Sequence, residues 1–177
     1  MIELEKTIIG SCFGEDQFKK VSFLEPDDFT NYPQKPYREY FKLLKKTNAE
    51  QDCLIECLQH CEDKGIYNLL CEQTNLLGLN NIDRFALKLL EMRFKALLMD
   101  LLTKLSMTSK KSVERELLRE ACLTLVKPET DVFELSDNLQ EYIGVHISDH
   151  TKNRLDSFLT YRDKRVEKAK QTINELR

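Results

Sequence analysis

The long run from Asn81 to Leu105 constrains the fold of this chain more than any other feature, because it contains neither glycine nor proline. Apolar residues recur in it at steps of three and four, which is the spacing of one face of an α-helix. Asn81 can cap its N-terminus. At about 1.5 Å per residue, the helix would be roughly 36 Å long. We therefore expect a helix that extends well beyond a compact N-terminal part.

A second amphipathic stretch follows at once. The polar turn 106–111 separates it from the long helix, and it begins at Ser112 and ends before Pro128. Two helices joined by a short polar turn predict an antiparallel helical hairpin. Four residues of the second helix are expected to share its apolar face: Val113, Leu117, Ala121 and Cys122.

The remaining segments also have helical periodicity. Five glycines, four prolines and no tryptophan argue against a turn-rich β fold, and Asp131 and Glu134 have the spacing of a capping box. The predicted fold is all-α, with a small helical head at 1–80, a hairpin with a closing helix at 81–147, and a C-terminal linker helix at 148–177. The further helices are predicted at 4–13, 15–23, 36–47, 50–63, 66–74, 131–147 and 151–177.

The C-terminal helix is the basic part of an acidic chain. The net charge of the chain is −3, whereas residues 151–177 contain eight lysines and arginines and four acidic residues. One Tyr and one Phe do not make a stacking platform for bases, so any DNA contact is expected to be weak or indirect. Apolar residues alternate at steps of four and three, with one arginine among them, as in a coiled-coil seam. The docking seam consists of Leu155, Leu159, Val166, Ala169, Ile173 and Leu176, with Arg162 between them.

Such a polar helix buries too little surface to be stable alone. We therefore expect its seam to dock on another domain, and otherwise to fray or to pair with a neighbouring chain.

The cysteines and histidines raise the question of a metal site. Cys53, Cys57 and Cys61 with His60 lie on one predicted helix, but three thiolates on one straight helix cannot surround a tetrahedral ion. Buried core cysteine is the favoured interpretation, and a metal-dependent enzyme that uses this cluster is the third hypothesis. The pair His146 and His150 crosses a predicted helix end, which spoils the geometry for a shared metal.

Nothing else in the sequence indicates catalysis. No Gly-x-x-x-x-Gly-Lys-Ser/Thr loop occurs, so we expect no ATP hydrolysis by these residues. Asp27 and Asp28 lack a nucleophile and an oriented base, and a turn beside Pro26 explains them better. No apolar run is long enough to span a membrane and no signal peptide is present, so a cytoplasmic protein with free thiols is expected. We predict no catalytic, cofactor or metal site.

The order of several motifs resembles a known family. Glu5 to Gly10 is similar to an opening "E…ILG" helix, and Leu24-Glu-Pro-Asp-Asp-Phe29 to an "L-x-P-E-D-F" turn. Tyr37 to Leu44 matches the helix after that turn, Arg84 to Leu90 the entry to a long hairpin helix, and Asp131-Val-Phe-Glu-Leu a closing acidic helix. Over nearly all of 1–147 this order resembles the N-terminal domain of DnaB-like replicative DNA helicases.

The resemblance implies an assembly domain. In that family the heads and hairpins pair between subunits into a collar, primase and helicase loader bind the assembly, and the linker helix packs on a neighbouring motor domain. ATP and magnesium would belong only to that motor, which these residues lack. We therefore expect a homo-oligomer in DNA replication, whose subunit interface uses Phe85, Leu89, Phe94, Leu97, Leu101, Leu117 and Ala121.

The residues also support this expectation independently, because the hairpin presents more apolar positions than two facing helices can cover. We expect the chain to continue beyond Arg177 into a motor domain. The alternative is a stand-alone adaptor or regulator that uses such a head to bind a helicase or primase.

Overall fold

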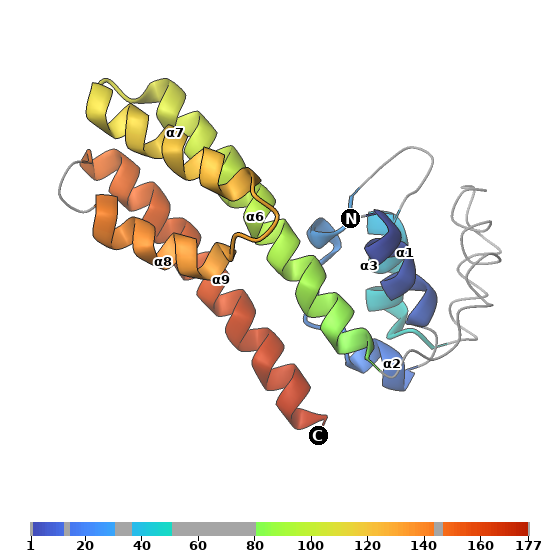
Figure 1. Ribbon diagram of the computed structural model, residues 1–177. Helices are drawn as coiled ribbons and strands as arrows, with labels where there is room; N and C mark the ends of the chain where they lie inside the picture. Colours follow the sequence, from blue (N-terminus) through green and yellow to red (C-terminus); the bar gives the residue numbers. More distant parts are fainter. Residues whose placement is uncertain (1, 13–14, 31–36, 51–80, 144–146, 177) are drawn as a thin grey trace. The chain divides into compact units, whose positions relative to one another are not determined.

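The fold is all-α, as the sequence predicts. The computed structural model describes residues 2–12, 15–30, 37–50, 81–143 and 147–176, and every regular element in these ranges is helical (Figure 1). The predicted helices at 50–63 and 66–74 fall outside the described residues, apart from the first residue of 50–63. The elements of the N-terminal part are α1 (Ile2–Ser11), α2 (Glu15–Lys19), the 3₁₀ turn η1 (Pro26–Asp28) and α3 (Tyr37–Thr47).

The C-terminal elements are longer. They are α6 (Ile82–Thr108), α7 (Ser112–Val126), α8 (Val132–Ile143) and α9 (Asp149–Glu175). The predicted ends agree within a few residues, and the largest differences are at α2, which stops at Lys19 instead of residue 23, and at α8, which stops at Ile143 instead of residue 147. Tight turns replace the last helical turn of α2, with the amide of Val21 bonded to the carbonyl of Phe18 and that of Leu24 to the carbonyl of Val21.

The chain divides into two compact units. The first contains Met1–Leu90 together with Glu167–Arg177, and the second contains Glu91–Val166. Helices α6 and α9 therefore supply residues to both units. Each unit is described by itself.

The core of the first unit is rich in aromatic residues. The rings of Phe29 and Phe41 lie 4.5 Å apart, and that of Phe18 lies 5.9 Å from Phe41. Helix α3 presents its apolar face to α1 and to η1, because its buried residues repeat at three and four positions. The largest fully buried side chains near them are Ile8, Ile9, Phe23, Leu24, Tyr37, Tyr40 and Leu44.

Two buried carboxylates hold the acidic turn in the first unit. Asp28 accepts a hydrogen bond from the backbone N–H of Glu25 at 2.7 Å, which closes η1 on itself. Glu5 on α1 accepts bonds from the backbone N–H of Thr30 at 3.2 Å and from its hydroxyl at 2.5 Å. Because Glu5 is fully buried, these bonds compensate for its loss of hydration. They attach the end of the turn to α1.

The second unit is built on the predicted hairpin. Helix α7 runs back along α6 (Figure 1), Thr103 Oγ1 lies 3.8 Å from Cys122 Sγ, and the Lys95 ammonium donates to the carbonyl of Lys127 at 2.8 Å. Helix α8 then packs on α7. An aromatic cluster joins α6 to α8 and α9, with Phe94 edge-on to three rings: Phe133 at 6.0 Å, Phe158 at 6.5 Å and Tyr161 at 6.2 Å.

Candidate docking surface

The orientation of helix α7 determines which of its apolar residues are buried in the second unit and which remain exposed. Its buried residues are Glu114, Leu118, Ala121 and Leu125. Of the predicted apolar face (Val113, Leu117, Ala121, Cys122), only Ala121 belongs to the observed one. Val113 is exposed, and Leu117 and Cys122 are half-buried.

A groove lies between α7 and α8, on the side where Leu117 is half-buried. It has a volume of about 470 Å³, which is in the size range of protein ligand sites. Four apolar side chains line it together with polar ones on both helices. The lining residues are Leu117, Glu120, Ala121, Thr124, Leu135, Asn138, Leu139 and Glu141.

The groove is acidic. Glu120 comes from α7 and Glu141 from α8, and no lysine or arginine is among the lining residues. Both carboxylates belong to exposed residues, and neither forms a salt bridge with any residue that the structure describes. A surface with an apolar floor and one sign of charge at its edges is suited to a ligand that is apolar with positive flanks.

Arg162 of α9 fixes the position of α8. Its side chain is only 8% exposed and donates to Asp137 at 2.8 Å and to Asp163 at 2.7 Å. It also donates to the hydroxyl of Ser136, and its guanidinium lies 5.8 Å from the centre of the Phe133 ring. A buried arginine is stable only with such partners. The one charged member of the predicted seam thus holds α8 in place from the side opposite the groove lining.

Glu114 fixes the start of α7. It is 1% exposed and accepts hydrogen bonds from the hydroxyl of Ser109 at 2.7 Å and from that of Ser148 at 3.0 Å. Burial alone would raise the pKa of Glu114, but the bonds from Thr151, Ser109 and Ser148 outweigh it and lower the pKa to about 2. The ionised carboxylate therefore joins the α6–α7 turn to the residues that open α9.

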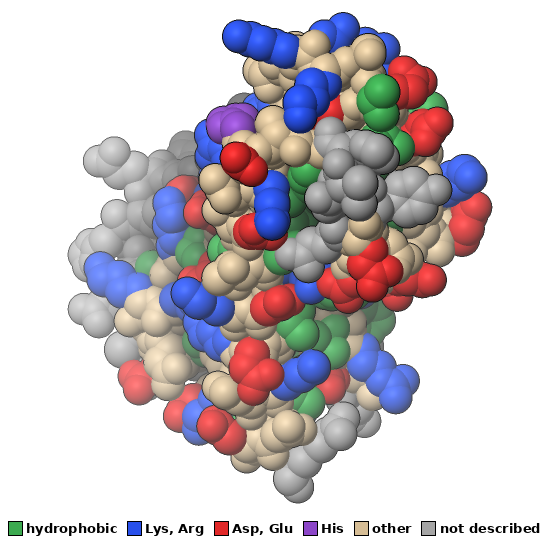
Figure 2. Space-filling model, turned by 90° about the vertical axis from the view of Figure 1, so that its left-hand side faces the viewer, with side chains coloured by type: hydrophobic (Ala, Val, Ile, Leu, Met, Phe, Trp, Pro, Cys, Tyr) green, Lys and Arg blue, Asp and Glu red, His purple; other side chains and the backbone are tan. Residues whose placement is uncertain are grey.

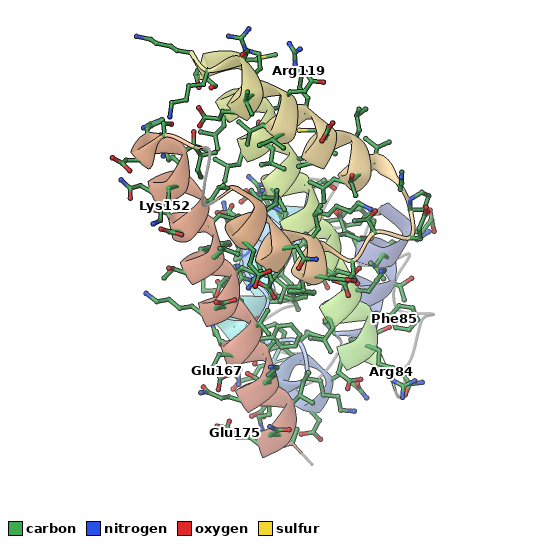
Figure 3. The ribbon with its side chains drawn as sticks, turned by 60° about the vertical axis from the view of Figure 1, so that its left-hand side comes forward. Arg84, Phe85, Arg119, Lys152, Glu167 and Glu175 are labelled. Atoms are coloured by element: carbon green, nitrogen blue, oxygen red, sulfur yellow. The ribbon has the colours of Figure 1, made fainter. Side chains whose placement is uncertain are left out.

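The outer side of α7 carries exposed apolar side chains. Leu123 is 68% exposed and Val126 is 69% exposed. By helical position they share this side with Arg119, whose side chain points away from α8 and α9 (Figure 3). Elsewhere on the molecule, acidic and basic side chains are interspersed over the face in Figure 2. The outer face of α7, defined here as Arg119, Leu123 and Val126, was missed by the sequence analysis. Its signal was the pair Leu123 and Val126, which are three residues apart and lie on the opposite side of α7 from Ala121.

The predicted interface residues are not brought together on one surface. Leu89 and Phe94 are fully buried and Ala121 nearly so, whereas Phe85 is exposed and points outward from α6 (Figure 3). Leu97, Leu101 and Leu117 are half-buried. Helices α8 and α9 cover part of the hairpin's apolar surface, since Phe94 packs on rings from both. Of the predicted set, Leu117 and Ala121 line the groove.

The docking of the C-terminal seam on another domain stays a prediction. Helix α9 is one continuous helix, and as far as residue 169 most of its seam is buried within the chain. Lys168 is bonded to Glu25 at 2.8 Å, and Glu25 is bonded to Lys45 at 2.6 Å. The seam residues Leu155, Leu159, Arg162 and Ala169 are buried, Val166 and Ile173 are half-buried, and Leu176 is exposed.

The other candidates of the sequence analysis have simple roles or fall outside the described residues. Asp27 is exposed and lies 3.6 Å from Arg38, whereas Asp28 caps the turn. His150 is exposed in the first turn of α9. The residues outside the described ranges are Cys53, Cys57, His60, Cys61 and His146.

Across the described ranges, no three potential ligands are grouped to hold a metal ion. Within the same residues, no helix has the length and apolar content to cross a bilayer. The thiol of Cys12 is fully buried in the first unit, and burial raises its pKa, so it is a core residue rather than a reactive one.

No protein-family model, curated protein or solved structure matches this chain.

Proposed function

We propose that this chain is a non-catalytic assembly and partner-binding domain, of the kind that forms the collar of a DnaB-like replicative helicase. The observation that carries the proposal is the exposed apolar surface of the hairpin: Leu123 and Val126 are about two-thirds exposed on adjacent turns of α7. Exposed apolar side chains that lie together on a helix mark association surfaces.

Several features of the head support the same function. The motif residues that resemble the family have structural roles in the first unit: Glu5 binds Thr30 and Asp28 caps the acidic turn. A head built on this turn and followed by a long hairpin is what the resemblance implies. Primase and helicase loader are the partners that the proposal implies, and DNA contact would be indirect.

Self-association tests the proposal. We expect sedimentation velocity at tens of micromolar to give a dimer or a larger species, and the double variant Leu123→Glu with Val126→Glu to give a monomer, because two like charges would face each other across a symmetric contact. Leu87→Glu is the matched control, since Leu87 is an exposed leucine of α6 outside the outer face of α7. A compact monomer for the unmodified chain, or no change in the double variant, would contradict the proposal.

The coding sequence that follows Arg177 distinguishes the helicase domain from the adaptor alternative. A phosphate-binding loop encoded downstream identifies a helicase, and a stop codon identifies an adaptor.

A further inference from the structure

The groove between α7 and α8 is suited to bind a third helix. Its floor is apolar and comes from both helices: Leu117 and Ala121 from α7, and Leu135 and Leu139 from α8. Two packed helices leave a channel that runs along their contact, and a third helix fills it by placing side chains at i, i+3 or i+4, and i+7 into the floor.

The charge at the edges of the groove selects the kind of helix. Glu120 stands on the α7 edge and Glu141 on the α8 edge. The segment 112–143 as a whole contains eight acidic and three basic residues. Three of its acidic residues already have partners: Glu114 is buried among hydroxyls, Asp137 pairs with Arg162, and Asp131 accepts a hydrogen bond from the backbone N–H of Phe133.

We propose that the α7–α8 groove binds a basic amphipathic α-helix of a partner protein. Apolar side chains of that helix fill the floor, and lysine or arginine residues on its two flanks pair with Glu120 and Glu141. This inference rests on the proposed function in one respect, namely that the chain is a partner-binding domain, and it adds the chemical class of the partner and the surface that receives it.

A second copy of the chain does not offer such a helix from its described residues. Helices α6 and α9 each contain two more basic than acidic residues. Their apolar residues, such as Phe94, Leu155 and Leu159, are buried in their own chain. Helix α3 has basic residues as well, yet its apolar residues Tyr40 and Phe41 are fully buried. The charge of the groove therefore points to a helix from another protein.

Two synthetic peptides test the proposal. One is a helix of roughly 18 residues, long enough to be helical when bound, with leucine at positions three and four apart and lysine on both flanks. Its twin has glutamate at every lysine position. With the full 177-residue chain and fluorescence anisotropy, we expect the basic peptide to bind at least tenfold more tightly than the twin, and more weakly as salt is raised. Equal binding of the two peptides would overturn the proposal.

Charge reversal locates the site. Glu120→Lys with Glu141→Lys should weaken the basic peptide at least tenfold and strengthen the acidic twin. The matched control is Glu3→Lys with Glu175→Lys, which changes the net charge equally at exposed residues of α1 and α9. Circular dichroism would verify that all variants are folded. An equal loss of binding in the control would show that only overall charge matters, and the proposal would fail.

Backbone amide NMR gives an independent readout. We expect the basic peptide to shift the signals of Ala121 and Leu139 and to leave those of α1 unchanged. Shifts confined to α9 or to the first unit would place the peptide elsewhere and overturn the assignment. The sedimentation test of Leu123 and Val126 remains separate, so failure of peptide binding and failure of self-association are distinguishable. If Glu120→Lys with Glu141→Lys instead abolished self-association, a second copy would be the occupant and the proposal would be wrong.

Discussion

Glu114 illustrates how a single acidic residue can be part of a core. Helical periodicity treats a glutamate as a solvent-facing position, yet Glu114 occupies the buried face of α7. Its carboxylate is compensated by hydroxyl and amide donors from Ser109 and Ser148. Ser148 lies 34 positions away in sequence, so no local pattern could have identified this contact.

The depressed pKa of Glu114 makes stability depend on pH. Its pKa is about 2 in the folded chain against 4.5 as the ordinary value. Its contribution is therefore fully present above about pH 4.5 and is lost as the pH falls from 4.5 towards 2. We expect Glu114→Gln to lower the free energy of unfolding by about 1–2 kcal/mol at pH 7.

Urea unfolding followed by circular dichroism at pH 7 and pH 3 measures this difference. The difference in the free energy of unfolding between the unmodified chain and Glu114→Gln should be less than half as large at pH 3 as at pH 7. An unchanged difference would mean that hydrogen bonding to the ionised carboxylate is not the cause. Glu116→Gln, at an exposed position of the same helix, is the control and should change stability little at either pH.

The two hairpin helices show how far periodicity determines an element. The ends of α6 and α7 follow from the turn at 106–111 and from Pro128, and both helices form where the sequence predicts them. The inward face does not follow in the same way. Leucines surround much of α6, so several phases of the helix bury similar apolar area. The face of α6 that points inward is the one that carries Phe94, because the Phe94 ring packs on aromatic side chains of α8 and α9.

Two phenylalanines of α6 test this assignment directly. Phe94 is fully buried, whereas Phe85 is 37% exposed. We expect Phe94→Ala to lower the free energy of unfolding by about 3–4 kcal/mol through the cavity it leaves, and Phe85→Ala to change it by less than about 1 kcal/mol. Thermal and urea unfolding of both variants provide the measurement, and similar costs at the two positions would contradict the observed phase of α6.

At the scale of the whole molecule, α9 contributes residues to both compact units. In the second unit Leu155 and Leu159 are buried, and in the first Lys168 is bonded to Glu25. The lysine and the glutamate are both partly exposed, so their pairing contributes little by itself. The buried small residue beside it, Ala169, indicates closer packing.

Substitution of Ala169 tests whether this end of α9 is packed in solution. Ala169 is fully buried, so Ala169→Asp would place an unpaired carboxylate in a dry site. We expect a loss of at least about 2 kcal/mol in the free energy of unfolding. Asn174→Asp is the control, because Asn174 is an exposed residue of the same helix. Hydrogen exchange should accelerate in α1 and α3 for Ala169→Asp, and a free, frayed α9 would instead tolerate both changes equally.

The sequence by itself determined the helices and the acidic turn. Spacing, capping residues and proline act over a few positions, so α1, α3 and α6–α9 could be predicted to within a few residues, and so could Asp28 as a residue of the turn. Only the tertiary structure decided which faces are covered. Burial depends on partners distant in sequence: α8 and α9 cover Phe94, α9 contributes Arg162 to hold α8, and the α7–α8 groove exists because α7 turns Leu118 and Leu125 inward, not Leu117.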